Sequence, residues 1–158
     1  MKTHLEHFDL SRRYNRFVRQ IVRHDTVWTL QDDDDFFAEC PSLHEEDALG
    51  EPRMVWCFWS DEAHALRCRQ DEWHDYACVS WPLSDFINDV LLPMQHDGQW
   101  VGIEFDTELC GMETEPMALL ADLLHEIAQQ YGEAEFDDWP RWQRACRAWQ
   151  AEQKRSMH

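Results

Sequence analysis

The chain has 158 residues, of which 44% are hydrophobic and nine are tryptophans, and its formal net charge is −18. This length suits a single domain with a sizeable core, and the aromatic content argues against a disordered chain. A charge this negative repels phosphate backbones and anionic lipids, and no apolar run approaches the roughly 18 residues needed to span a bilayer, so we expect neither a nucleic-acid nor a membrane partner.

The first predicted element is an amphipathic helix over residues 12–23. Tyr14, Phe17 and Ile21 recur at helical spacing, while arginines occupy the opposite face. Ser11 immediately precedes this pattern and is a suitable N-cap.

Four consecutive aspartates, Asp32–Asp35, separate two β-prone segments, Val27–Leu30 and Phe36–Ala38. This arrangement predicts a β-hairpin with the aspartates in its turn, because Asp tolerates left-handed backbone angles and accepts hydrogen bonds from nearby N–H groups. The polar segment Ser42–Pro52 that follows is expected to form a loop.

The run Met54–Trp59 is apolar at every position, which predicts an interior strand covered on both faces. Ser60 follows it and is a candidate N-cap for a helix with acids in its first turn and Arg67 and Arg69 near its end. A further helix is predicted from Ser84 to Leu92, ended by Pro93.

The chain then turns at Asp97-Gly98 into a predicted strand over Trp100–Phe105. Pro116 and Gly132 bound the clearest helix, with proline in its first turn and glycine at its C-terminal cap. An acidic segment, Glu133–Asp138, is interpreted as a hinge before a basic amphipathic helix.

The fold expected from these elements is α+β. One domain over residues 1–132 contains a mainly antiparallel sheet of about four strands with helices packed on it. Residues 133–158 add the hinge and a C-terminal helix, whose apolar stripe includes Trp142 and Trp149 and either folds back or docks elsewhere.

Six cysteines occur without any CxxC pair, and the N-terminus lacks the apolar core of a signal peptide. We therefore expect reduced thiols and a cytoplasmic location.

A metal site is considered at two places. The aspartate run does not match a calcium loop, because positions six and twelve counted from Asp32 are Phe37 and Leu43 rather than Gly and Glu. Two His/Cys pairs have the four-residue spacing of zinc ligands on a helix face: His64 with Cys68 and His74 with Cys78. Isolated cysteines are more often small buried hydrophobes, so we predict no metal and no cofactor.

The motifs of common catalytic sites are absent: no nucleophile elbow, phosphate-binding loop, HExxH or dinucleotide fingerprint occurs. Glu104 and Asp106 could serve as an acid–base pair, but a strand end that faces water explains both. We predict no catalytic residues. A hydrolase or metal-dependent enzyme that uses His64, His74 and nearby carboxylates is kept as an alternative.

The charge is unevenly distributed. Residues 25–138 carry 29 of the 32 acidic residues and only three of the 14 basic ones, a net charge of −26, whereas both ends are basic. Such a body attracts cationic molecules over a Debye length of about 8 Å at physiological salt.

We interpret the chain as a binding module for a basic protein, in its most concrete form an immunity protein or an inhibitor of a basic toxin or enzyme. One or two exposed tryptophans beside carboxylates would anchor an Arg or Lys of the partner. A housekeeping domain whose charge only keeps it soluble is a further alternative, and the oligomeric state is not indicated. The residues expected to contact the partner are Asp32, Asp33, Asp34, Asp35, Glu45, Glu46 and Asp47.

A series of short motifs between Val27 and Leu120 spans roughly three-fifths of the chain: Val27–Asp33, Val55–Ser60, Asp71–Trp73, Pro82–Phe86, Asp97–Gly102 and Glu115–Pro116. In this order they resemble the DUF2750 family, small bacterial domains of unknown function. The resemblance implies a compact α+β domain and brings no catalytic residues. Members of the family usually have Gly after the acidic pair, where this chain has Asp34 and Asp35.

Overall fold

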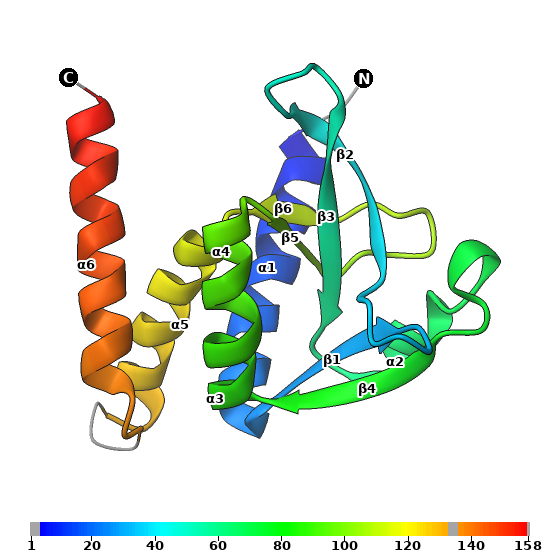
Figure 1. Cartoon of the computed structure of the whole chain (residues 1–158). Helices are drawn as coiled ribbons and strands as arrows, with labels where there is room; N and C mark the ends of the chain where they lie inside the picture. The colour runs from blue at the N-terminus through cyan, green and yellow to red at the C-terminus, as the bar shows by residue number, and fades with distance from the viewer. Residues whose placement is uncertain (1–3, 133–135, 158) are drawn as a thin grey trace.

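The computed structural model describes residues 4–132 and 136–157 and has an α+β architecture built around one mixed sheet (Figure 1). The sheet has six strands: β1 (Thr26–Gln31), β2 (Glu39–Glu46), β3 (Pro52–Trp59), β4 (Ala77–Pro82), β5 (Trp100–Ile103) and β6 (Met112–Thr114). Their order is β4-β1-β3-β5-β6, and β2 also pairs with β3. The α+β class is as predicted, but the expected four strands were too few, and β3 and β5 run parallel.

The helices lie mainly on one side of this sheet in Figure 1. They are α1 (His4–His24), α2 (Glu62–Arg67), the short 3-10 turn η1 (Asp71–Trp73), α3 (Leu83–Asp85), the π-helical segment η2 (Phe86–Leu91), α4 (Leu92–Asp97), α5 (Pro116–Gln130) and α6 (Trp139–Ser156).

Strand β3 is the central strand, as its apolar run predicts. It pairs antiparallel with β1 and β2 and parallel with β5. Successive side chains alternate between the two faces: Phe58 belongs to the larger core, whereas Cys57 and Trp59 belong to a smaller one on the other face. Both faces of the sheet are therefore covered.

The larger core lies between the sheet and the helices α1, α3–α4, α5 and α6. Phe17 and Ile21 of α1 and Leu120 and Leu123 of α5 are fully buried in it. Each of these helices presents an apolar stripe at helical spacing, and burial of such stripes is the main source of helix stability in proteins.

The smaller core is closed by α2, η1 and the segment 104–111. Phe105 folds back over Gly102 and Gly111, where added Cβ atoms would lie 2.9 Å and 2.3 Å from its ring. These two glycines therefore allow the segment to lie flat against the sheet. The main-chain oxygen of Phe105 then accepts hydrogen bonds from Trp59 Nε1 (2.8 Å) and Cys68 Sγ (3.3 Å).

Two predicted N-caps are wrong. Helix α1 begins at His4, so Ser11 lies inside it, because the apolar stripe continues upstream through half-buried Leu10. The cap of α2 is Asp61, whose side chain accepts from the N–H of His64 at 2.8 Å. Ser60 instead bonds to Glu104.

The predicted hairpin of Val27–Leu30 with Phe36–Ala38 is confirmed only next to the turn, where the N–H of Ala38 donates to the carbonyl of Leu30 at 2.8 Å and Gln31 forms an isolated bridge with Phe37. The chain continues into β2, which pairs with β3, so most of the expected loop Ser42–Pro52 is strand. Strand β4 pairs with β1 along its whole length and was not predicted.

Pro93 does not end the helical run that starts at Leu83. In η2 the N–H of Leu92 bonds to the carbonyl of Ile87, five residues earlier, and α4 then starts afresh with Pro93 in its first turn. A proline is tolerated there because first-turn N–H groups need no intrahelical partner. The run ends at Gly98, which has a left-handed conformation (φ 75°).

The C-terminal helix α6 folds back on α5. Trp142 and Cys146 are buried in the larger core, and Asn88 of η2 accepts from Trp142 Nε1 at 2.8 Å. The predicted hinge Glu133–Asp138 lies partly outside the described residues. The proposed division after residue 132 stays a prediction. No helix in the described ranges is long and apolar enough to cross a membrane.

Candidate functional site

The aspartate run forms the turn between β1 and β2. Asp32 Oδ1 accepts hydrogen bonds from the N–H groups of Asp34 and Phe36, both at 2.9 Å, and Asp35 has a left-handed φ of 66°. Asp33, Asp34 and Asp35 are exposed. The run therefore has a clear structural role at its first residue and a solvent-exposed negative tip beyond it.

The other predicted contact residues lie at the opposite end of β2. Glu45 and Glu46 are exposed near the tip of the β2–β3 hairpin, and Asp47 Oδ1 accepts from the N–H groups of Leu49 (2.9 Å) and Glu51 (3.1 Å). The seven predicted residues thus form two separate acidic regions rather than one.

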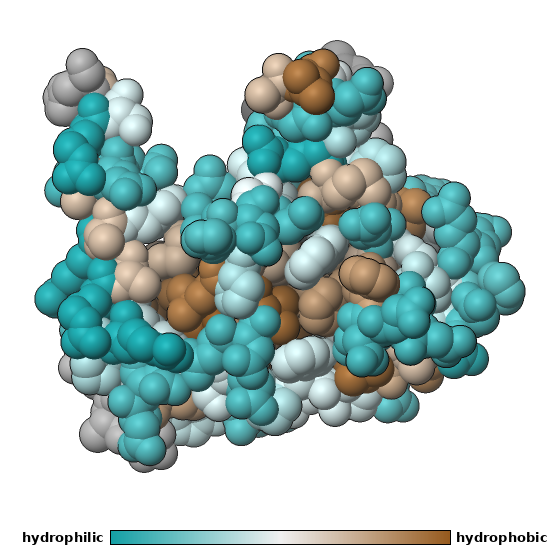
Figure 2. Space-filling model, viewed as in Figure 1, coloured by the Kyte–Doolittle hydropathy of each residue, from teal (hydrophilic) through white to brown (hydrophobic). Residues whose placement is uncertain are grey.

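A third acidic region, which sequence reasoning missed, forms a cavity of about 350 Å³ between β2, η1 and segment 104–111. We call it the acidic groove, and its lining includes Glu39, Asp71, Glu72, Glu108, Trp73 and Leu109. None of the described residues that line it is basic. In the view of Figure 2, the surface at the end of the molecule that carries segment 71–76 is almost wholly hydrophilic.

The acidic surface continues from the groove to the aspartate turn. Burial, and then the negative charges of Asp32, Asp75, Glu39 and Glu72, raise the pKa of the Tyr76 hydroxyl. Of the four predicted aspartates, Asp32 is therefore the one whose charge acts on the same hydroxyl group as the groove residues Glu39 and Glu72.

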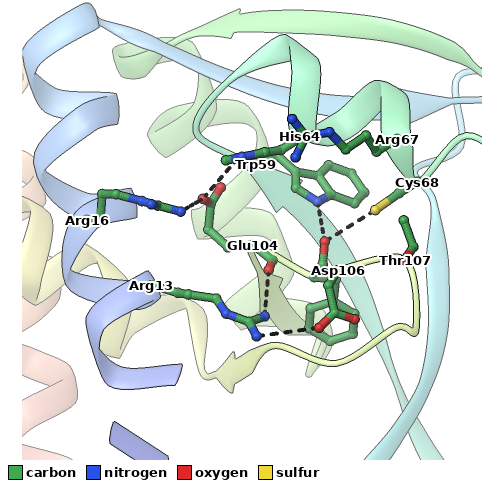
Figure 3. A pocket seen from close by; sticks show the side chains of 10 residues that line it. Arg13, Arg16, Trp59, His64, Arg67, Cys68, Glu104, Asp106 and Thr107 are labelled. Carbon is green, nitrogen blue, oxygen red and sulfur yellow. Dashed lines mark hydrogen bonds and ion pairs between the residues drawn. The ribbon is translucent and has the colours of Figure 1, made fainter. Parts of the chain in front are cut away.

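A second cavity, of about 260 Å³, lies between α1, α2 and segment 104–111 (Figure 3). We call it the arginine pocket, and its charged lining is Arg13, Arg16, Arg67, His64, Glu104 and Asp106. It occupies the carboxyl ends of the neighbouring parallel strands β3 and β5, where open α/β sheets commonly form ligand sites.

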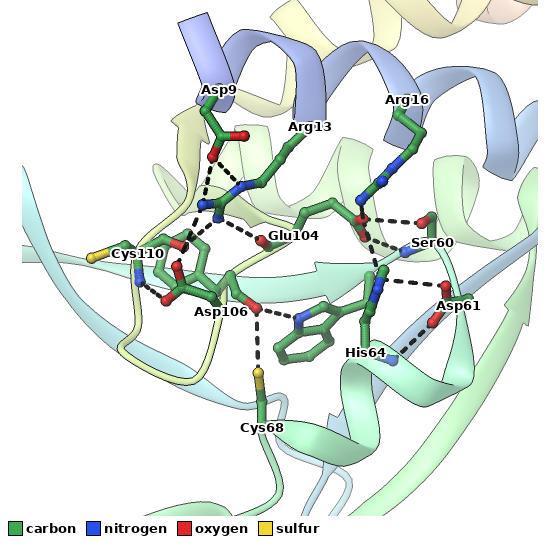
Figure 4. Close-up of polar contacts among 12 residues, drawn as sticks. Asp9, Arg13, Arg16, Ser60, Asp61, His64, Cys68, Glu104, Asp106 and Cys110 are labelled. Atoms are coloured by element: carbon green, nitrogen blue, oxygen red, sulfur yellow. Dashed lines mark hydrogen bonds and ion pairs between the residues drawn. The ribbon is translucent and has the colours of Figure 1, made fainter. Parts of the chain in front are cut away.

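Glu104 is the buried carboxylate of this pocket. Its backbone is left-handed (φ 53°), and its side chain is only 2% exposed. It accepts from the N–H of Ser60 at 2.5 Å and from the Ser60 hydroxyl at 3.1 Å, and it faces Arg16 at 3.5 Å and His64 at 3.7 Å (Figure 4). The sequence interpretation of Glu104 as a water-facing residue was wrong.

Arg13 ties α1 to segment 104–111. It bonds to Asp9 at 2.7 Å, lies 3.4 Å from Asp106 and donates to the carbonyl of Cys110 at 3.1 Å (Figure 4). Asp106 Oδ1 also accepts from the N–H of Cys110 at 3.1 Å, which closes the turn. Glu104 and Asp106 are therefore used separately, and the structure does not join them as an acid–base pair.

The two His/Cys pairs do not converge on a common point. Cys68 donates its thiol to a carbonyl, and burial is the main cause that raises its pKa to about 11. His64 Nδ1 faces Asp61 at 3.3 Å, whereas His74 Nδ1 bonds to a main-chain oxygen at 2.8 Å. Among the residues that the structure describes, no group of three or more His, Cys, Asp or Glu side chains could hold a metal ion.

The tryptophans serve packing. All nine are buried or half-buried, and Trp59 and Trp142 are among the fully buried side chains. Half-buried Trp56 donates to Glu39 at 3.2 Å, and Trp73, 5% exposed, lines the acidic groove. The expectation of one or two exposed tryptophans beside carboxylates was wrong.

The chain matches a known protein family. Residues 14–123 match the family described as "Protein of unknown function (DUF2750)". The chain belongs to the DUF2750 family. The DUF2750 match begins within α1 and ends within α5, so it contains the acidic groove and every lining residue of the arginine pocket except Arg13, whereas α6 lies beyond it. No curated protein and no solved structure matches the chain.

One sequence signal could have found the arginine pocket of this DUF2750 protein. Ser60 and Glu104 each follow directly after an apolar strand, β3 and β5. Polar residues at the ends of adjacent parallel strands meet at one edge of a sheet, but the parallel pairing was not predicted. The acidic groove gives no comparable signal because its carboxylates come from three distant segments.

Proposed function

We propose that this protein is an acidic binding module that accepts a basic segment of a protein partner in the acidic groove. The observation that supports this most strongly is the lining: four carboxylates from three segments surround one cavity that no basic residue among the described ones enters. Like charges held together repel one another, and an incoming cation relieves that repulsion.

The groove combines charge with apolar surface. Trp73 is buried and Leu109 is 42% exposed, and both provide apolar contacts beside the carboxylates. An Arg or Lys side chain has the matching character, because its aliphatic stem packs on apolar surface while its charged end pairs with carboxylates. A cavity of about 350 Å³ has room for one such side chain and part of its neighbour.

The remaining acidic residues extend the field around this contact. Asp32 continues the negative surface from the groove to the exposed aspartate turn, and Glu45, Glu46 and Asp47 add a second negative region at the other end of β2. Charges at such distances steer a basic partner toward the site and raise its rate of association. An immunity protein or inhibitor of a basic toxin or enzyme would use both effects.

The test compares two variants that lose the same charge. In the groove variant, three carboxylates that line the cavity become amides: Glu39→Gln, Glu72→Gln and Glu108→Gln. The control variant changes three exposed acids outside all three acidic regions: Asp89→Asn, Asp97→Asn and Glu152→Gln. Each protein is used to capture partners from native lysate at low and at high salt.

A basic protein captured by the wild type and released by salt should be retained by the control variant and lost by the groove variant. Exposed charge pairs contribute about 0.2–1 kcal/mol each, so three of them correspond to roughly tenfold in affinity. Equal capture by both variants would refute the groove as the contact. Loss of capture by both variants would show that binding depends on the total negative charge and not on the groove.

Two alternatives predict different results. If the charge is only solubilising, neither variant changes any interaction. A metal-dependent hydrolase would bind zinc stoichiometrically after purification, and this measurement is independent of the groove.

A further inference from the structure

The arginine pocket has no part in the proposed function, and its charge is opposite to that of the groove. It is lined by three guanidinium groups and two carboxylates in a protein whose net charge is −18. We infer that this pocket binds the phosphate group of a small-molecule ligand through Arg16, His64 and Arg67.

One of the three arginines of the pocket serves the fold, and the other two face the cavity. Arg13 is committed to the protein, because it bonds to Asp9, Asp106 and the carbonyl of Cys110. Its role is to hold segment 104–111 against α1. A ligand would gain little from a guanidinium already surrounded by acceptors.

Arg16 and Arg67 have donors to spare. Arg16 has one ion pair, with Glu104 at 3.5 Å, and is half exposed. Arg67 is exposed at the end of α2, and its guanidinium makes no hydrogen bond or ion pair with any described residue. Because a guanidinium carries five N–H donors, both offer most of theirs to a ligand in the cavity that they line.

His64 supplies a third donor from the same side as Arg67. Its Nδ1 lies between Asp61 (3.3 Å) and Glu104 (3.7 Å), whereas its Nε2 has no hydrogen bond with the described residues. Figure 3 shows His64 and Arg67 on the α2 side of the pocket and Arg16 on the α1 side. The three groups would therefore hold a ligand from two sides.

Glu104 does not oppose this role, because it is not the group that an entering anion meets. Both of its oxygens accept hydrogen bonds from Ser60, and its side chain is only 2% exposed behind Arg16. Glu104 thus acts as a positioning residue that holds Arg16 and His64 at the pocket wall.

The donor set favours phosphate over carboxylate. A planar carboxylate is satisfied by one guanidinium fork, whereas a phosphate monoester has three terminal oxygens and close to two negative charges. Two guanidinium groups and an imidazole match that number of acceptors and that charge. The cavity of about 260 Å³ accommodates a phosphate and a small organic group attached to it.

The probe for the test is inorganic phosphate, titrated into the full-length protein at constant ionic strength and followed by NMR chemical shifts and calorimetry. Arg67→Gln is the principal variant, because the Arg67 side chain makes no hydrogen bond or ion pair with the described residues. Arg69→Gln, an exposed arginine two residues away that does not line the pocket, is the matched control. Arg16→Gln is the second variant.

We expect saturable phosphate binding that is weakened about tenfold or more by Arg67→Gln and by Arg16→Gln, and is unchanged by Arg69→Gln. Acetate should bind more weakly than phosphate. Absence of saturable binding by the wild type would overturn the inference, as would equal weakening by Arg67→Gln and Arg69→Gln. Acetate binding as tight as phosphate would overturn the assignment to phosphate.

Discussion

Replacement of Glu104 by glutamine tests the assignment of this residue as the electrostatic link between the strand ends and α1. The substitution keeps the shape of the side chain and removes its charge. The carboxylate accepts two hydrogen bonds from Ser60 and pairs with Arg16 and His64 in a nearly fully buried position. A glutamine can keep one oxygen acceptor, but its amide nitrogen is a donor that faces the remaining partners.

The magnitude follows from those contacts. A hydrogen bond to a charged group contributes about 1.5–3 kcal/mol, compared with about 0.5–1.5 kcal/mol for a neutral one. With one bond weakened, one acceptor lost and Arg16 left beside an amide, Glu104→Gln should lower the free energy of unfolding by about 2–4 kcal/mol. Arg16 is half exposed and can recover hydration, which keeps the loss below that of a fully buried ion pair.

The backbone of Glu104 gives an internal comparison. Because its φ is 53°, any residue with a Cβ is strained there, and glycine is not. Glu104→Ala and Glu104→Gly both lose the carboxylate, so the difference between them isolates the strain, which should favour glycine by about 1 kcal/mol.

Urea denaturation followed by circular dichroism gives the required free energies for all three variants and the wild type. Asp33→Asn, in the exposed aspartate turn, is the control for loss of one negative charge and should change stability by no more than about 0.5 kcal/mol. If Glu104→Gln were as stable as this control, the carboxylate would not be the link inferred here. Equal stability of the alanine and glycine variants would show that the left-handed backbone at residue 104 is not strained by a Cβ atom.

Three further predictions concern the cores. Gly111→Ala should cost about 1–3 kcal/mol in urea denaturation, because its Cβ would lie 2.3 Å from a ring carbon and 2.6 Å from a main-chain oxygen. Trp142→Ala should cost about 3–5 kcal/mol, whereas Met157→Ala, 82% exposed at the C-cap of the same helix, should be neutral; equal losses would refute the packing of α6 on the domain. Burial raises the pKa of the Cys68 and Cys146 thiols from 9.0 to about 11, so these thiols ionise at lower pH in the unfolded chain than in the folded one. The free energy of unfolding should therefore be highest below pH 9 and fall as the pH rises toward 11. This fall should be less steep when both cysteines are replaced by alanine.

The elements that the sequence could predict are those whose own residues determine them. Met54–Trp59 is apolar on both faces, so it could only be an interior strand, and α5 carries its own proline start and glycine end. The apolar stripe of α6 also predicted which side it would bury. In each case the local pattern and the tertiary contacts agree.

The elements that could not be predicted depend on distant partners. Strand β6 has only three residues and exists because it pairs with β5. Strand β4, with no fully buried residue, is defined by its ladder with β1 rather than by its own apolar pattern. Pro93 misled the helix prediction because the π-helical segment before it changes the hydrogen-bonding register.

The same distinction applies to the sites. The aspartate run was recognisable as a turn, because Asp32 caps its own neighbours. The acidic groove and the arginine pocket were not recognisable, since each joins three segments that are distant from one another in the sequence. Only the sheet topology shows that Ser60 and Glu104 are neighbours.

The two cavities share Cys68 and Thr107 as a common wall, so their opposite charges lie close enough to influence each other. When the arginine pocket is empty, its guanidinium groups partly offset the negative potential of the groove. A phosphate would cancel that offset, and a basic segment in the groove should then bind more tightly; by linkage, the segment should strengthen phosphate binding by the same factor. Across a solvated wall we expect less than about 1 kcal/mol. Partner capture should therefore increase on addition of phosphate relative to chloride at equal ionic strength, and Arg67→Gln should abolish the increase. If phosphate and chloride changed partner capture to the same extent at equal ionic strength, the two sites would be independent.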